Sequence, residues 1–159
     1  KDIATREAMS EHSFELPAHR FKTKGIWFPV SEDTLDEVRR LGFDCPGGLH
    51  AFEHAAIAAL PLFALCDRMD IGGVSYTFSP LLESPGIFIY DGYEGGIGLT
   101  KRGFDVIKDW FEATLSLMED CACEVSCPSC TQDPQCGNNN DPLDKRAAMV
   151  MIKRWMGKK

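Results

Sequence analysis

The sequence lacks a long hydrophobic run. None of its apolar stretches reaches the roughly 18 residues that a membrane-spanning helix requires, so we expect no membrane contact. The first twenty residues are charged and mixed, and we therefore expect no secretory signal peptide. Closely spaced thiols without such a signal indicate a reducing compartment, so we expect a cytoplasmic protein. The chain also has no internal repeat and no low-complexity tract.

Positive charge is scarce as well. The 17 lysines and arginines stand against 24 aspartates and glutamates, which gives a net charge of −7. Bulk charge therefore gives no signal for nucleic-acid binding, and any basic patch has to be local. The length of 159 residues suggests one domain, or one domain with a small appendage, and 44% apolar residues can form a real core. The chain opens with Lys1 rather than Met, so we expect a piece of a longer protein.

Cysteine is too rare for a disulfide scaffold. Seven cysteines in 159 residues fall well below the roughly 8–10% typical of that class, and seven is an odd number. Cys127-Pro-Ser-Cys130 has the two-residue spacing of a chelating turn, and Cys121 and Cys123 lie just upstream to supply two more ligands. Four thiolates satisfy the tetrahedral preference of Zn²⁺, so zinc is the favoured occupant. With Cys136 the cluster has five candidate ligands within sixteen residues, so one is spare.

Two alternatives to zinc stay open at this cluster. An iron–sulfur cluster also takes four thiolates. Disulfides are disfavoured, because Cys121 and Cys123 are too close in sequence for an easy bridge. A site closed by four protein ligands is structural rather than catalytic. Its expected role is to stabilise a loop-rich segment that has too few apolar residues to fold alone.

The hydrophobic pattern predicts an α+β fold, with a small, mostly antiparallel sheet packed by three or four helices and a cysteine-rich zinc-binding segment near the C-terminus. We expect residues 1–120 to form the α+β part and residues 121–159 the zinc-binding segment and last helix, together one structural unit. The most apolar helix should be central and buried, with a kink at Pro61. Strands are expected at 13–16, 21–30, 73–79 and 86–91, and helices at 31–42, 49–66, 99–120 and from about 142 onward.

One motif in the central helix resembles an enzyme site. His50-Ala-Phe-Glu53-His54 matches the inverted zinc-protease pattern, in which two histidines bind zinc and the glutamate activates water. The motif needs a third, distant ligand, for which Glu119 or Glu124 can be nominated. The favoured alternative is that both histidines are satisfied by hydrogen bonds within a core helix, so we expect no catalytic residue here.

Two further polar stretches are expected to be structural. Asp67, Arg68 and Asp70 can form a fork-shaped ion pair or a helix-end network, and an acid–base dyad is the weaker alternative. The glycine-rich loop 91–98 precedes a helix but lacks the Lys-Ser/Thr of a nucleotide-binding loop, and Asp91 would repel phosphate. A glycine hinge is the default interpretation. The predicted structural network comprises His50, Glu53, His54, Asp67, Arg68, Asp70 and Asp91.

Basic residues gather at two places. Lys101 and Arg102 follow the glycine-rich loop and could contact a nucleic-acid backbone. The last helix carries a basic stripe, which is either solvated or a phosphate-contacting surface beside the zinc segment. The candidate nucleic-acid contacts are Lys101, Arg102, Lys145, Arg146, Lys153 and Arg154.

Three stretches in this order resemble a known family: GLHAFEHAAIAALPLFALCDRMDIGG, IFIYDGYEGGIGLTKRGFD and CACEVSCPSCTQDPQCGNNNDPLDKRAA. The chain from about Phe21 to Ala148 is similar to the zinc-binding domain at the C-terminal end of DEAD/DEAH-type helicases related to mitomycin repair factor A. In that family four cysteines bind a structural zinc. The resemblance implies Cys121, Cys123, Cys127 and Cys130 as the ligands here. That set does not need Cys136, which we keep as the alternate ligand. The resemblance attaches no protease activity to His50–His54.

The resemblance also implies a parent that is an ATP-dependent superfamily-two DNA helicase of 3′-to-5′ polarity serving DNA repair, and hence a nucleoid-associated location. No Walker motif and no helicase Asp-Glu-x-His occur in these 159 residues, so ATP would act only through motor domains elsewhere. We expect a non-catalytic, zinc-stabilised accessory domain that guides or grips single-stranded DNA. The alternatives are a module that docks on the helicase motor domains, or a zinc hydrolase that uses His50, Glu53 and His54.

Overall fold

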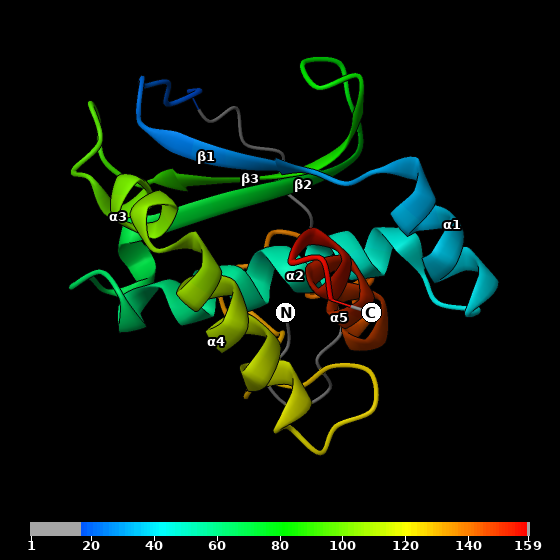
Figure 1. Ribbon diagram of the computed structural model, residues 1–159. Helices are drawn as coiled ribbons and strands as arrows, with labels where there is room; N and C mark the ends of the chain where they lie inside the picture. Colours follow the sequence, from blue (N-terminus) through cyan, green and yellow to red (C-terminus); the bar gives the residue numbers. More distant parts are fainter. Residues whose placement is uncertain (1–16, 159) are drawn as a thin grey trace, which may run out of the picture.

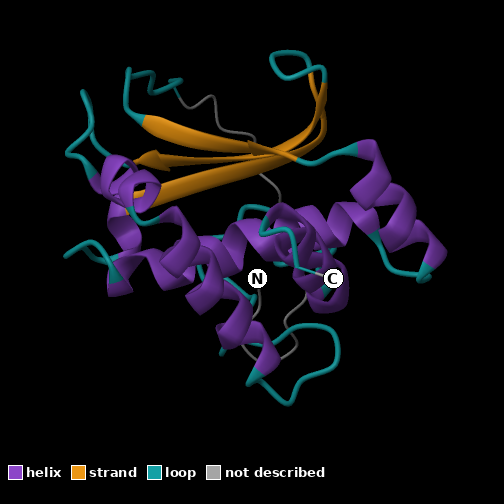
Figure 2. Ribbon diagram, in the orientation of Figure 1, coloured by secondary structure: helices purple, strands orange, loops and turns teal. Residues whose placement is uncertain are grey.

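The computed structural model describes residues 17–158, in which helices gather on one side of a three-stranded sheet (Figure 1, Figure 2). The expected α+β architecture is confirmed, while the strand expected at 13–16 lies outside the described residues. No helix of the described part is both long and apolar enough to cross a membrane. The elements are β1 (Gly25–Pro29), α1 (Glu32–Arg40), α2 (Cys45–Ala59), two short 3-10 turns (Leu60–Leu62 and Arg68–Asp70), β2 (Ile71–Ser79), β3 (Ser84–Asp91), α3 (Leu99–Asp105), α4 (Ile107–Glu119) and α5 (Lys145–Trp155).

The sheet is antiparallel, with β3 in the middle and β1 and β2 at its edges. Phe28 lies opposite Ile87 and is buried, because the alternation of side chains along a strand turns these residues toward the helices. Trp27 lies opposite Phe88 on the other face, where 55% of its surface is exposed. Within residues 17–158 no helix covers that outer face (Figure 1), so the sheet presents aromatic side chains outward.

Helix α2 is the buried centre of the fold, as its composition predicted. It packs against α5, α4 and β2, and nearly every one of its residues from Gly47 onward is buried. Glycine at position 48 lets α5 approach closely, since a Cβ there would lie 2.5 Å from the Cβ of Ala147. The helix was expected to continue to residue 66 with a kink, and this was wrong. It ends at Ala59 and passes into the 3-10 turn around Pro61, which has no N–H to continue the helix.

The helix expected over 99–120 is two helices. The chain breaks at Val106, so that α3 can pack against β1 and β3 while α4 packs against α2 and α5. One straight helix could not reach both. The break brings Trp110 into the core, where its indole N–H donates to the carbonyl of Ala56 at 2.7 Å. Helix α5 begins at Lys145 because the side chain of Asp144 accepts the N–H of Ala147 and caps the helix.

Candidate metal centre

Four cysteine sulfurs gather on the loop between α4 and α5. Their Sγ atoms all lie within 4.8 Å of one another, with 3.4 Å between Cys121 and Cys127, 3.4 Å between Cys123 and Cys130, and 3.6 Å between Cys127 and Cys130. Tetrahedral zinc–sulfur bonds of about 2.3 Å place sulfurs about 3.8 Å apart, so the group has the size that one ion requires. All seven cysteines are free, so the disulfide alternative finds no support. Soft, closely spaced thiols fit zinc by donor chemistry.

The backbone of the chelating turn holds this group together. The carbonyl of Cys127 accepts the N–H groups of Cys130, Thr131 and Gln132 at 3.1–3.2 Å, which curls the chain around the sulfurs. Cys130 is buried at the base of the turn. The cluster that the spacing predicted is therefore formed by local structure, before any distant contact is considered.

The four thiols differ in their surroundings. A hydrogen bond from Cys121 lowers the pKa of the Cys127 thiol to about 6, whereas burial raises the pKa of the Cys130 thiol to about 12. A metal of the zinc type binds the deprotonated sulfur, so its binding to the group releases protons.

Lys145 corrects one expectation about the basic stripe of α5. It is only 5% exposed, and its ammonium group donates to the carbonyl oxygens of Cys121, at 2.8 Å, and Cys123. It is therefore not part of a surface that could contact phosphate. Four thiolates around a dication carry a net charge of −2, and the ammonium group of Lys145 lies where it can offset part of that charge.

The other basic residues of α5 face carboxylates. Lys153 pairs with Glu119 at 2.7 Å, Arg154 pairs with Glu37, and Arg146 lies 3.9 Å from Glu124. The expected stripe is present on the surface, but each of these three charges is already opposed by an acid. Such exposed pairs contribute little to stability, because solvent and salt screen their attraction. Their main effect here is to reduce the attraction of α5 for phosphate.

The basic residues of α3 lie in a different setting. Lys101 and Arg102 are both exposed, and Lys101 is only loosely paired with Asp105, at 3.7 Å. Lys101 lines a groove of about 530 Å³ together with Lys24 of the segment before β1. The same groove is lined by Trp27 and by Phe104, which is 66% exposed. This edge of the molecule joins positive charge to exposed aromatic rings.

The histidines of α2 meet a cysteine from the distant loop. His50, His54 and Cys136 place their ligand atoms within 4.8 Å of one another, so Cys136 takes the third position that the motif required. Glu119 and Glu124, nominated for that position, lie elsewhere and pair with the basic residues of α5 described above. Both histidine rings are hydrogen-bonded to backbone carbonyls, His50 to that of Pro142 and His54 to that of Thr131.

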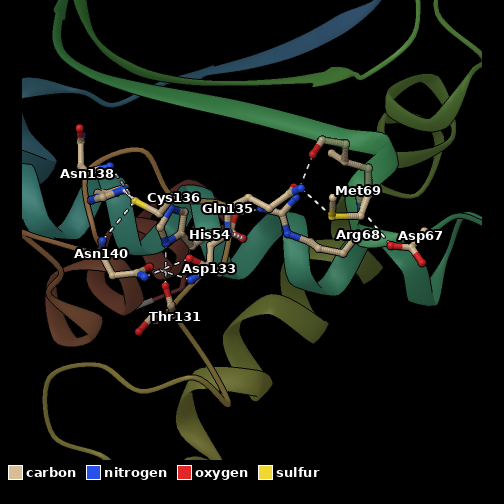
Figure 3. A network of polar contacts seen from close by, with 12 residues as sticks. His54, Asp67, Arg68, Met69, Thr131, Asp133, Gln135, Cys136, Asn138 and Asn140 are labelled. Carbon is tan, nitrogen blue, oxygen red and sulfur yellow. Dashed lines mark hydrogen bonds and ion pairs between the residues drawn. The ribbon is translucent and has the colours of Figure 1, made fainter. Parts of the chain in front are cut away.

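Glu53, the third member of the motif, lies in the same hollow as the two histidines. Burial raises its pKa to about 7 and lowers the pKa of His54 to about 4. Arg68 also lines the hollow and forms an ion pair with the buried Asp133 (Figure 3). Asp133 was not among the predicted residues, because nothing in the sequence near it indicates a partner so far away.

Asp67 and Asp70 form a helix-end network rather than a fork around Arg68. The carboxylate of Asp67 accepts the N–H of Met69, and the carboxylate of Asp70 accepts the N–H of Asp67, in a reciprocal capping arrangement. Asp70 also accepts a hydrogen bond from the hydroxyl of Tyr93 at 2.6 Å, which lowers the pKa of Asp70. These contacts join the turn before β2 to the glycine-rich loop.

Asp91 occupies the anion position of the glycine-rich loop. Its carboxylate accepts the backbone N–H groups of Ile97, Gly98, Leu99 and Thr100, and the hydroxyl of Thr100, at 2.7–3.2 Å. Burial alone would raise its pKa, but the hydrogen bonds from Thr100 and from the loop outweigh burial and lower it. The amides that could have bound a phosphate are thus already satisfied by the protein's own carboxylate.

Comparison with known proteins gives a consistent result. The profile of the MrfA Zn-binding domain matches residues 52–131. An uncharacterized protein of Methanocaldococcus jannaschii is 36% identical over 111 residues, which are 68% of this chain and 99% of that protein. The uncharacterized ATP-dependent helicase YprA of Bacillus subtilis is 30% identical over 135 residues, which are 80% of this chain and 17% of the helicase.

Solved structures agree with these sequence matches. A crystal structure of the DUF1998 helicase MrfA bound to DNA superimposes with a TM-score of 0.65 at 26% identity, covering 96% of this chain and 19% of the helicase. The same helicase bound to DNA and AMPPNP gives a TM-score of 0.62 at 26% identity, covering 93% of this chain and 18% of the helicase. The chain thus spans less than a fifth of these helicases. The profile match, the related sequences and the shared fold show that this chain belongs to the family of MrfA Zn-binding domains.

Proposed function

We propose that Cys121, Cys123, Cys127 and Cys130 hold one structural zinc ion, and that the chain is a non-catalytic accessory domain of an ATP-dependent DNA helicase that grips single-stranded DNA. The compact set of four sulfurs supports the metal assignment. The related helicases, of which this chain matches less than a fifth, support the larger context. The chain carries no motor motif of its own, so ATP hydrolysis would belong to other parts of such a helicase.

The DNA-gripping role is carried by one observation, the groove between β1 and α3. Its lining combines two lysines, Lys24 and Lys101, with the exposed rings of Trp27 and Phe104. Proteins that hold single strands pair a positive groove with aromatic rings on which bases stack. Basic residues of both α3 and α5 were candidate contacts from the sequence. Of these, Lys101 of α3 lines the groove, whereas the surface charges of α5 are opposed by acids.

The role is tested by binding to a fluorescent oligothymidylate of about 15 nucleotides, the upper end of the site sizes of single-strand-binding folds. We expect weak affinity that falls steeply with salt, because released counterions drive the binding. Trp27→Ala should weaken binding by about 1–3 kcal/mol, the usual contribution of one stacked base. The double variant Lys24→Ala, Lys101→Ala should weaken binding about tenfold. It should also reduce the slope of the logarithm of the binding constant against the logarithm of the salt concentration, by about 0.7 for each phosphate that is no longer neutralised.

Lys153→Ala is the matched control, because this lysine is on α5 and already paired with Glu119. It should leave the affinity within about twofold, the size expected for a screened surface charge. No affinity for the oligonucleotide at low salt, or equal losses in the control and groove variants, would contradict the gripping role.

A second candidate function is docking on the helicase motor domains. It is favoured by the outer face of the sheet, where Trp27, Tyr76 and Phe88 line an apolar groove of about 660 Å³. A patch of this kind is typical of a contact surface. Crosslinking of this chain to separately purified motor domains tests the docking role. If the chain docks through this face, Tyr76→Ser and Phe88→Ser should abolish the crosslink. Crosslinks that neither change affects would exclude this face.

A further inference from the structure

A second group of metal-type ligands lies apart from the four thiols. His50 and His54 are one turn apart on α2, and Cys136 comes from the loop that follows the four-cysteine turn. The Sγ atom of Cys136 lies 3.3 Å from Nε2 of His50, and the ligand atoms of all three residues lie within 4.8 Å of one another. Three soft or borderline donors therefore face one point.

Hydrogen bonds orient both imidazole rings toward that point. Nδ1 of His50 lies 2.8 Å from the carbonyl oxygen of Pro142, and Nδ1 of His54 lies 2.8 Å from that of Thr131. A carbonyl only accepts, so each Nδ1 carries the proton and each Nε2 keeps its lone pair. Metal-binding histidines are fixed in this way, with one ring nitrogen donating to a carbonyl and the other bound to the ion.

The sulfur of Cys136 is held by the loop backbone. It accepts the N–H groups of Asn138 at 3.4 Å and Asn140 at 3.3 Å (Figure 3). Asn140 is itself fixed, because its side chain accepts the N–H of Asp133 at 2.7 Å and donates to the carbonyl of Asp133 at 3.0 Å. These two backbone donors fix the position of the sulfur in the hollow. All three side chains are thus oriented as ligands.

A simple hydrogen bond between Cys136 and His50 does not account for this arrangement. It would need one histidine, whereas His54 also brings its ligand atom to the same place and has its ring fixed by Thr131. The group opens into a hollow of about 310 Å³ that is also lined by Arg68 and Asp133. There is therefore space beside the three donors for a further ligand.

We propose that His50, His54 and Cys136 bind a second zinc ion, separate from the four-thiolate site, whose fourth position is open to water in the hollow. Two imidazoles and one thiolate suit Zn²⁺ by donor softness. Three protein ligands with one exchangeable position are typical of open rather than closed zinc sites. The ion would join α2 to a loop that lies 86 residues further along the chain.

The test is the metal content of the purified full chain after saturation with zinc and removal of unbound metal. We expect two zinc ions in the wild-type chain, and one in Cys136→Ala and in His50→Ala. Cys66→Ser, which removes a cysteine outside both groups, should keep two. One ion in the wild-type chain that is kept in His50→Ala, or two ions in Cys136→Ala, would overturn the proposal. If only the four-thiolate site failed to bind zinc, the wild-type chain would hold one ion and His50→Ala would hold none. Failure of one site can therefore be told apart from failure of the other.

A second measurement needs no variant and so does not depend on how the variants fold. The wild-type chain is alkylated with iodoacetamide, and modification of Cys136 is followed by mass spectrometry with one and with two equivalents of zinc. The second equivalent should slow alkylation of Cys136 at least tenfold, because a metal-bound thiolate is shielded. An unchanged rate would overturn the proposal.

Discussion

The two groups of metal-type ligands differ in how the chain brings them together. The sulfurs of Cys121, Cys123, Cys127 and Cys130 come from ten consecutive residues, and a local turn arranges them. His50, His54 and Cys136 meet only because α2 packs beside the loop that precedes α5. The first group depends on chain spacing and the second on the finished fold.

The surroundings of the two groups of ligands also differ. The four sulfurs supply a full tetrahedral set, and Lys145 contacts the backbone of that set from the start of α5. The histidine–cysteine group supplies three donors beside a hollow. A complete donor set suits a structural ion, and an incomplete set beside open space suits an exchangeable ligand. Changes that affect one group and spare the other test this contrast.

The largest effect is expected from Cys127→Ser. It should remove the four-thiolate zinc and lower the free energy of unfolding by several kcal/mol, since structural zinc contributes on the order of 10 kcal/mol in small modules. Urea unfolding followed by tryptophan fluorescence, with zinc analysis of the same sample, measures both quantities. Cys66→Ser is the control and should cost only about 1 kcal/mol. Retention of that zinc in Cys127→Ser would contradict the ligand assignment.

A smaller effect is expected from Lys145→Met, which keeps the length of the side chain but removes its ammonium group. The buried carbonyls of Cys121 and Cys123 would lose a charged donor, so unfolding should become easier by about 2–4 kcal/mol and zinc affinity should fall. Zinc competition with a chromophoric chelator measures the affinity. Arg146→Met changes the exposed neighbouring residue and should leave both quantities nearly unchanged. Equal effects of the two changes would show that Lys145 does not support the four-thiolate group.

The smallest effect is expected at the glycine-rich loop, which is held by a carboxylate instead of a metal. Asp91→Asn should lower the free energy of unfolding by about 2 kcal/mol near pH 7, because the amide offers one acceptor oxygen where the carboxylate offers two. The pKa of Asp91 is lowered in the folded chain, so its contribution is present above the unfolded value of about 3.9 and is lost as the pH falls through the folded pKa. The difference in the free energy of unfolding between wild type and Asp91→Asn should therefore shrink in acid.

Urea unfolding at several pH values measures this gap, and a chelator should leave it unchanged. Asp120→Asn alters an exposed carboxylate at the end of α4 and provides the control. A gap that persists in strong acid, at about pH 2, would show that ionisation of Asp91 is not what stabilises the loop.

The features that form through local interactions were predicted from local sequence patterns. The spacing of Cys127 and Cys130 predicted the thiol cluster, and the apolar composition of α2 predicted its central place. At Pro61 a kink was expected where the helix in fact ends. The break at Val106 was missed, because it depends on which neighbours α3 and α4 pack against. A window of sequence contains no information on that packing.

The features of the two metal-type sites that the sequence did not predict depend on contacts between residues far apart in the chain. Cys136 seemed spare beside four closer cysteines, yet the fold places it next to His50. Lys145 seemed part of a basic stripe, yet its side chain turns inward to the loop carbonyls. The Cys-Gly-Asn-Asn-Asn stretch was a usable signal for a tight turn at Cys136, since glycine and asparagine favour turns.

The four-thiolate site is tested most directly by zinc X-ray absorption on the Cys136→Ala chain, in which only that site should hold metal. We expect one zinc ion per chain with four sulfur neighbours at about 2.3 Å and no nitrogen neighbour. A folded chain without zinc, or a zinc shell with nitrogen or oxygen neighbours, would contradict that expectation.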